Sequence, residues 1–266
     1  MRGSHDQSSS PESADVLSVH GVSRSFGGVY AVRDVSLGIA GGEVRGIIGP
    51  NGAGKSTLFN LITGHLAADQ GTISFESARI DRLSPHLRAR LGISIVFQGA
   101  RVFRGMTVRE NVMVGAHSRT RTGFTAAALR LPRHRRDERE IARLADEALG
   151  RVGLGAWADR QAGLLPLGQQ RSMQVARALC AEPRLLLLDE PASGLRAGER
   201  EALAVLIEEL RAGGLTIMLV EHDVAFVTRL ADRITVLDLG RIIAEGTPGE
   251  VRADPLVVSA YLGEAS

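Results

Sequence analysis

One lysine stands out because the chain contains no other. Lys55 lies in the run Gly49-Pro50-Asn51-Gly52-Ala53-Gly54-Lys55-Ser56-Thr57, which matches the pattern G-x-x-x-x-G-K-[ST]. In that pattern backbone N–H groups wrap a phosphate chain, the ammonium group reaches the terminal phosphates, and the next hydroxyl group holds Mg²⁺. Arginine would not replace this lysine easily, since its planar guanidinium is wider than a compact ammonium group. The run therefore predicts a phosphate-binding loop.

The same letters could instead form a glycine-rich turn before an amphipathic helix. Their surroundings favour the phosphate loop, because Glu43–Ile48 is a short apolar run and Ser56–Thr63 has the pattern of a helix. This gives the order strand, loop, helix that a phosphate site requires.

Two adjacent carboxylates form the second chemical feature. Leu185–Asp189 is an apolar strand that ends in Asp189 and Glu190, at the edge where open α/β sheets bind their ligands. In a phosphate-loop enzyme the first acid supports Mg²⁺, and the second orients a water molecule for attack on the γ-phosphate. A surface strand that happens to end in two acids is the alternative. We favour the functional interpretation, because a wholly apolar strand rarely ends in two acids without a cause.

Gln98 and His222 each follow an apolar, strand-like run, and neither means much alone. A lone histidine in a loop is more often a surface residue than a catalyst. Only their order relative to the phosphate loop and the Asp189-Glu190 pair makes them candidates.

The bulk composition is that of an ordinary globular protein. The chain has 266 residues, of which 44% are hydrophobic and 23% charged, and a net charge of +2. No apolar stretch is long enough to span a bilayer and no secretory signal is visible, which predicts a cytosolic protein unless a partner carries it to a membrane. The single cysteine, Cys180, excludes an internal disulfide and is expected to pack in the core. The basic run Arg130–Arg139 is interleaved with acids, so we expect a solvated helix face and no nucleic-acid partner.

The elements that must position these residues alternate between strand and helix. Residues 1 to about 15 predict a disordered tail. The segment Gly99–Ala181 has helical patterns and predicts a helical insertion in an α/β core. The tail Thr247–Leu262 predicts one or two short helices separated at Asp254-Pro255. Strands are further predicted at Val16–His20, Ala31–Ile39, Thr72–Phe75, Gly92–Phe97, Thr216–Glu221 and Arg233–Leu237, and helices at Arg82–Arg90, Gly198–Arg211 and Val224–Leu230.

With these motifs in this order, the sequence resembles the nucleotide-binding subunit of ABC transporters from about Val16 to Gly263. The resemblance implies an α/β P-loop NTPase fold, with an N-terminal antiparallel β subdomain and an inserted helical subdomain. It implies a core of residues 16–98 and 182–246, a helical signature subdomain of 99–181 and a C-terminal helical tail of 247–266.

The resemblance also implies roles for single residues in binding and hydrolysing ATP with Mg²⁺. Phe26 matches the aromatic residue that stacks on adenine, and Tyr30 is a nearby second candidate. The implied roles are Gly49–Thr57 as the Walker A loop, with Lys55 catalytic and Ser56 on Mg²⁺; Gln98 as the Q-loop, catalytic and on Mg²⁺; Asp189 as the Walker B acid on Mg²⁺; Glu190 as the catalytic carboxylate; Ala192–Arg196 as the D-loop; and His222 as the switch histidine.

The segment Leu165–Arg171 stands where this family has its L-S-x-G-Q signature, before a helix predicted at Gln170–Ala181. In the family this segment faces the ATP of the opposite subunit, which implies that Leu165, Gly168 and Gln169 contact nucleotide. Two positions depart from the pattern, since Pro166 replaces the usual serine and Arg196 stands where the D-loop usually has Asp, Asn or Ser. A milder departure is Ile95-Val96, in place of a more polar pair before Phe97-Gln98.

Segments outside the shared motifs resemble the branch that imports branched-chain amino acids, with importers of urea or amides left open. They are Phe103–Val112, Leu164–Arg171, Glu221–Asp223, Ala244–Pro248 and Ala260–Gly263. The resemblance implies transmembrane permease partners, a second ATP-binding subunit in a hetero- or homodimer, an indirect substrate-binding protein, and a peripheral position on the cytoplasmic face of the inner membrane. Two other hypotheses are a regulatory ABC module that hydrolyses ATP poorly, suggested by Pro166 and Arg196, and a soluble ABC protein that acts on nucleic acid. Intact Glu190 and His222 disfavour the first, and the single domain without a basic stripe disfavours the second.

Overall fold

The structure of this chain is a computed structural model that describes residues 15–99, 102–119 and 132–262. The predicted disordered tail lies outside these ranges except for Asp15, which is the first residue of a strand. The first two residues of the basic run Arg130–Arg139 also lie outside them, and the rest of that run belongs to a helix.

The strands form two sheets. An antiparallel sheet has the order β2-β1-β4-β5, and a larger sheet has the order β10-β9-β3-β8-β7-β6. In the larger sheet the strands from β9 to β6 run parallel, and β10 is antiparallel to β9. The strands are β1 Asp15–Phe26, β2 Val29–Ala40, β3 Val44–Ile48, β4 Gln70–Phe75, β5 Ala78–Arg79, β6 Ile93–Val96, β7 Leu185–Asp189, β8 Thr216–Val220, β9 Arg233–Asp238 and β10 Arg241–Gly246.

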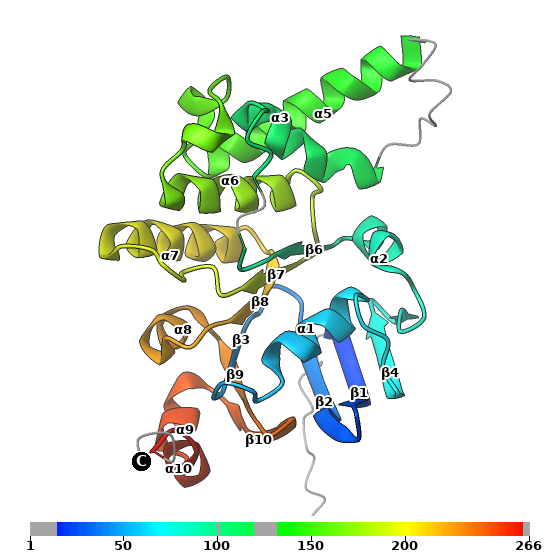
Figure 1. Ribbon diagram of the computed structural model, residues 1–266, viewed down its shortest axis with the longest axis vertical. Helices are drawn as coiled ribbons and strands as arrows, with labels where there is room; N and C mark the ends of the chain where they lie inside the picture. The colour runs from blue at the N-terminus through cyan, green and yellow to red at the C-terminus, as the bar shows by residue number, and fades with distance from the viewer. Residues whose placement is uncertain (1–14, 100–101, 120–131, 263–266) are drawn as a thin grey trace, which may run out of the picture.

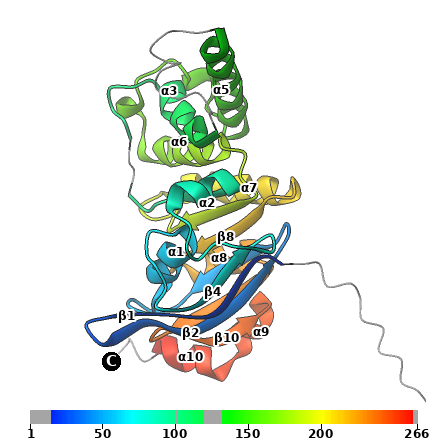
Figure 2. The same cartoon turned by 90° about the vertical axis from the view of Figure 1, so that its right-hand side faces the viewer.

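The helices gather in distinct places around these sheets. The α-helices are α1 Lys55–Thr63, α2 Pro85–Leu91, α3 Val108–Met113, α5 Pro132–Arg151, α6 Leu167–Leu179, α7 Ala197–Ala212, α8 Val224–Leu230, α9 Pro248–Ala253 and α10 Pro255–Leu262. Three short 3₁₀ helices are η1 Val114–Arg119, η2 Gly155–Trp157 and η3 Ala162–Leu164. Helices α3, α5 and α6 stand together at one end of the molecule, and α9 and α10 lie at the other end (Figure 1). The antiparallel strands lie side by side with the lower part of the larger sheet (Figure 2).

Both faces of the larger sheet are buried, as is usual for parallel strands. In β7, Leu186 and Leu188 belong to a hydrophobic cluster shared with α6 and α7, whereas Leu185 and Leu187 belong to a second cluster shared with α1 and the antiparallel sheet. Alternate side chains of a strand point to opposite faces, so the two clusters account for the unbroken run of leucines. Asp189, the last residue of the strand, is partly exposed.

The predicted helical insertion is confirmed in the part of 99–181 that the structure describes, where the elements are helices and one isolated bridge joins Thr107 to Gln161. Helix α3 begins with a capping box, in which Glu110 N donates to Thr107 Oγ1 at 3.1 Å and Thr107 N donates to the Glu110 carboxylate at 2.7 Å. Cys180 is buried directly after α6, which confirms that it packs in the core.

Several element bounds differ from the prediction. Strand β1 continues past Gly21, because shifts of register absorb the glycine that ended the predicted strand. Strands β5 and β10 were not predicted, and α2 begins at Pro85 rather than Arg82 because Pro85 favours the first helical position. Helix α6 begins at Leu167 instead of Gln170, with Pro166 as its N-cap. The two C-terminal helices separated at Asp254 are confirmed. No helix of the described ranges is long and apolar enough to cross a bilayer.

Candidate functional site

The phosphate loop connects β3 to α1, in the predicted order. Gly54 is the N-cap of α1 with φ +102°, and a Cβ there would lie 2.3 Å from the carbonyl oxygen of Ala31. Gly49 has φ +151°, and a Cβ there would lie 2.1 Å from the carbonyl oxygen of Leu237. Both positions therefore require glycine, since the loop passes close to neighbouring backbone. The N–H groups of the first turn of α1 have no partner inside the helix, and such free donors at a helix start are suited to bind an anion.

Lys55 folds back into this loop. Its Nζ donates to the carbonyl oxygen of Gly49 at 2.6 Å and to that of Pro50 at 2.8 Å, and the residue is 7% exposed. A buried ammonium group needs such acceptors, because an unpaired charge is costly to remove from water. Phosphate oxygens could take the place of these carbonyl groups without moving the charge out of the loop.

The carboxylates Asp189 and Glu190 lie at the carboxyl end of β7, as predicted. Asp189 pairs with Val220 of β8, and Glu190 N donates to the Val220 carbonyl oxygen at 2.9 Å. Glu190 has φ +46°, which is uncommon for a residue with a side chain and is found preferentially at functional sites. Burial raises the pKa of the Asp189 carboxyl group, the charge of Glu190 raises it further, and the ammonium group of Lys55 lowers it. The charge of Lys55 thus acts on Asp189, which places the lysine near this carboxylate.

The structure brings three of the predicted residues together around one carboxylate. Gln98 Nε2 donates a hydrogen bond to Glu190 Oε2, and His222 Nδ1 lies 3.4 Å from Glu190 Oε1. The side chain of Glu190 is 15% exposed and that of His222 is 52% exposed. Glu190 therefore has a partner on each oxygen, and His222 faces solvent where a ligand could reach it.

Two charged residues near this site were not assigned a role from the sequence. Glu221 is buried after β8, its Oε1 accepts from Ala192 N at 2.8 Å, and burial raises its pKa. Arg171 is buried on α6, and its Nη1 donates weakly to the Phe97 carbonyl oxygen at 3.4 Å. The arginine thus links the helical part to the residue before Gln98. In the sequence, these two residues are marked only by their position, since Glu221 directly precedes His222 and Arg171 ends the segment Leu165–Arg171.

Phe26 and Tyr30 lie at the hairpin between β1 and β2, and both are about half exposed, at 48% and 45%. The guanidinium of Arg24 stands 4.9 Å from the centre of the Phe26 ring, and that of Arg33 stands 5.2 Å from the Tyr30 ring. The close approach of Ala31 to Gly54 puts this hairpin next to the phosphate loop. Both rings are therefore available for stacking beside the loop.

Within one chain, the predicted signature residues do not lie beside the phosphate loop. Gly168 and Gln169 lie in the first turn of α6 and Leu165 precedes this helix, whereas α1 lies on the other side of the larger sheet (Figures 1 and 2). Gln170 N donates to the Pro166 carbonyl oxygen at 2.9 Å, so the helix begins normally in spite of the proline. If these residues contact nucleotide, it must be one held by another chain.

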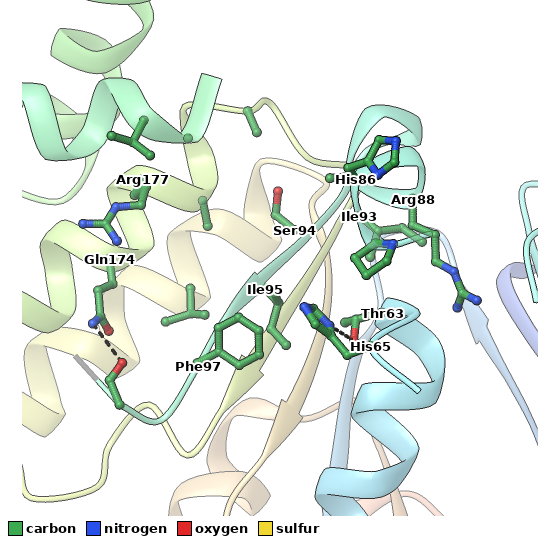
Figure 3. Close-up of a pocket in the computed structure, with 18 of the residues that line it drawn as sticks. Thr63, His65, His86, Arg88, Ile93, Ser94, Ile95, Phe97, Gln174 and Arg177 are labelled. Carbon is green, nitrogen blue, oxygen red and sulfur yellow. Dashed lines mark hydrogen bonds between the residues drawn. The ribbon is translucent and has the colours of Figure 1, made fainter. Parts of the chain in front are cut away.

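A cavity of about 460 Å³ lies beside the phosphate site instead of over it. Figure 3 shows side chains of α2, β6 and α6 converging on it, with His65 and Phe97 in its floor at a ring separation of 5.4 Å. Its lining is mainly apolar, and Gly99 and Phe97 of its wall flank Gln98 in the sequence. A molecule in this cavity would therefore touch the residues on either side of Gln98, whose side chain contacts Glu190.

We expect Asp189→Asn to raise the melting temperature of the nucleotide-free protein. The pKa of Asp189 is raised in the fold, so its contribution to stability is complete below the ordinary value of 3.8 and is lost as the pH rises through the folded pKa. The gain should therefore be larger at neutral pH than in acidic buffer, as measured by thermal unfolding. Asp81→Asn is the control, because a hydrogen bond from Arg79 lowers the pKa of Asp81 and its loss should destabilise. A lower melting temperature for Asp189→Asn at neutral pH would contradict this account.

Two family models match most of the chain, and known proteins match nearly all of it. Residues 32–193 match the family described as ABC transporter, and residues 241–266 match the one described as branched-chain amino acid ATP-binding cassette transporter. The high-affinity branched-chain amino acid transport ATP-binding protein BraF of Pseudomonas aeruginosa is 42% identical over 95% of this chain and all of its own length. The protein LivG of Escherichia coli K12, which has the same description, is 42% identical with the same coverage.

The solved structures that resemble this chain are also ATP-binding cassettes of ABC transporters. The ADP conformation of MJ1267, an ATP-binding cassette of an ABC transporter, has a TM-score of 0.82 and 33% identity over 94% of this chain and 99% of its own. A dimer of the bacterial cassette MJ0796 has a TM-score of 0.73 and 26% identity over 87% of this chain and 98% of its own. The predicted α/β P-loop fold is thereby confirmed. Taken with the phosphate loop and the carboxylates of β7, these matches show that the chain belongs to the family of ABC transporter ATP-binding proteins.

Proposed function

We propose that this chain is the ATP-hydrolysing subunit of an ABC importer for branched-chain amino acids. The observation that supports hydrolysis most directly is the position of Glu190, which follows Asp189 at the end of β7 and contacts Gln98 and His222. A carboxylate there can orient a water molecule for in-line attack on the γ-phosphate. Lys55 balances the charge of the β- and γ-phosphates, and His222 donates a hydrogen bond to the γ-phosphate. The backbone N–H groups of 51–57 bind the phosphate chain, and Phe26 or Tyr30 stacks on the adenine.

Magnesium fits the oxygen donors present here. The hydroxyl group of Ser56, the carboxylate of Asp189 and the amide oxygen of Gln98 are the hard ligands that Mg²⁺ prefers. The side chain of Gln98 donates to Glu190 through its nitrogen, so its amide oxygen takes no part in that hydrogen bond. When bound, Mg²⁺ supplies charge neutralisation on the β- and γ-phosphate oxygens. Burial raises the pKa of Asp189, and a bound cation would relieve the cost of ionising this buried acid.

The working unit is a dimer of ATP-binding subunits on a membrane permease. Because α6 and α1 pack against opposite faces of the larger sheet, each signature segment completes the site of a second chain, which is a homologous subunit or another copy. The permease contacts the cavity beside Phe97, because that cavity is mainly apolar and leads to Gln98. The chain is one ABC domain of residues 16–263, with a core of 16–98 and 182–246 and a helical subdomain of 99–181. It works at the cytoplasmic face of the inner membrane, with a substrate-binding protein as an indirect partner.

The solute is inferred from BraF and LivG, which are named for the transport of branched-chain amino acids. We expect leucine, isoleucine or valine to stimulate ATP hydrolysis by the chain when it is purified with its permeases and binding protein. Urea and short amides are the matched controls and should leave the basal rate unchanged. Stimulation by urea or an amide alone would contradict the proposed solute but not the ATPase.

The structure gives no support to a module that hydrolyses ATP poorly. Pro166 begins α6 without disturbing it, and the backbone of Arg196 takes the N-cap position of α7. Neither departure from the family pattern displaces Glu190, Gln98 or His222 from one another.

A further inference from the structure

The first turns of α6 and α7 share one carboxylate. Glu199 Oε1 accepts from Gly168 N at 3.2 Å, and Glu199 Oε2 accepts from Arg196 N at 3.0 Å. The two donors belong to different helices, which lie next to each other in Figure 1. Gly168 makes this approach possible, because a Cβ at that position would lie 2.4 Å from Glu199 Oε1. A glutamate at the third position of α7 thus reaches beyond its own helix.

We propose that Glu199 is a positioning residue that keeps the Gly168 N–H engaged until ATP of the second subunit displaces it. The proposal rests on the proposed function, in which the start of α6 faces that ATP. An N–H at a helix start is an anion donor, and a carboxylate already satisfies it in the single chain. A γ-phosphate that takes the same N–H must replace the carboxylate, because two anions at one donor repel each other. Glu199 therefore raises the ATP concentration that closes the dimer.

Two further contacts tie the first turn of α7 to the segment that follows His222. The next residue, Arg200, has Nη1 2.6 Å from Asp223 Oδ2, and Asp223 follows His222. Asp223 in turn caps α8, since its Oδ1 accepts from Phe226 N at 3.1 Å. Glu199 therefore contacts the start of α6, and its neighbour Arg200 contacts Asp223, the residue after His222. In the proposed function the start of α6 faces the ATP of the second subunit, and His222 faces the ATP of its own chain.

The start of α6 also contains an unsatisfied acceptor. Gln169 Oε1 is buried and has no hydrogen-bond partner among the described residues. A buried acceptor without a partner is uncommon and costs stability. The start of α6 therefore has one buried acceptor that a ligand or a second chain could satisfy.

The test is Glu199→Gln in the complete complex with permeases and binding protein. Glutamine keeps the size of the side chain but has no charge and a single acceptor oxygen, so it cannot hold both N–H groups. We expect the ATP concentration at half-maximal hydrolysis to fall by about tenfold, the equivalent of one charge-assisted hydrogen bond. The same fall should appear in ATP binding measured by calorimetry in the Glu190→Gln background. Glu199→Asp is a second variant, which keeps the experiment informative should Glu199→Gln fold poorly. It retains the charge but is too short to reach both N–H groups, and the half-saturating ATP concentration should fall by the same factor.

The matched control is Glu250→Gln in α9. Glu250 accepts from Thr247 N at 2.7 Å at the third position of its helix, and among the described residues its carboxylate accepts no hydrogen bond from another helix. Its replacement should lower stability as a lost cap does, with the half-saturating ATP concentration unchanged. An unchanged or higher half-saturating ATP concentration in both Glu199 variants would overturn the proposal and leave Glu199 a helix cap. A wild-type complex that does not hydrolyse ATP would instead overturn the proposed function, and this proposal with it.

Discussion

Replacement of Glu190 by glutamine is expected to leave ATP bound and to slow steady-state hydrolysis by at least about 100-fold, the usual contribution of a positioned acid or base. The amide has nearly the same shape, so Asp189 and Lys55 should still hold the phosphates. It lacks the charge that orients and polarises the attacking water. The measurement is phosphate release by the complex at saturating ATP, together with calorimetric binding of ATP.

Glu201→Gln is the control for this substitution. Glu201 is an exposed acid of α7 that pairs with Arg229 at the surface, and such pairs contribute little. Its replacement should leave hydrolysis at the wild-type rate. Undiminished hydrolysis in Glu190→Gln would refute the assignment of the catalytic carboxylate, and loss of ATP binding there would mean that Glu190 supports the ligand instead of the water.

Replacement of Lys55 by alanine should weaken ATP binding by about 30-fold or more. Removal of one partner from a buried, hydrogen-bonded charge pair costs about 2–5 kcal/mol, and 1.4 kcal/mol corresponds to a factor of ten. Lys55→Arg should also bind poorly, because the ammonium group fits between the carbonyl oxygens of Gly49 and Pro50 with almost no exposure, and a guanidinium is wider. Calorimetry with ATP measures both variants.

The composition of the chain offers an independent measurement. Lys55 is the only lysine, so a reagent selective for amines can modify only it and the N-terminal amino group. ATP should protect Lys55 from modification and leave the N-terminus equally reactive, which serves as the internal control. Equal labelling of Lys55 with and without ATP, or wild-type affinity in Lys55→Ala, would remove the lysine from the binding site.

The local chemistry of the site could be predicted because short segments carry it. The phosphate loop needs glycine at Gly49 and Gly54 for backbone approach and a lysine beside them, and these demands are met within nine consecutive residues. The strand β7 could be identified because burial on both faces forces an unbroken apolar run, which ends where Asp189 and Glu190 begin. The bounds of β1 and α6 could not be predicted as well, because a shift of register and a proline N-cap do not follow from periodicity.

What the sequence determined by itself was the set of reactive groups and the elements that bear them. What only the tertiary structure decided was which groups meet: Gln98, Glu190 and His222 come from three separate strand ends, and the parallel order β6-β7-β8 brings those ends to one edge. The contact of Glu199 with Gly168 likewise joins residues 31 positions apart across two helices. Periodicity reports which face of an element is buried, but contacts between distant segments depend on the packing of the whole chain, which no local pattern encodes.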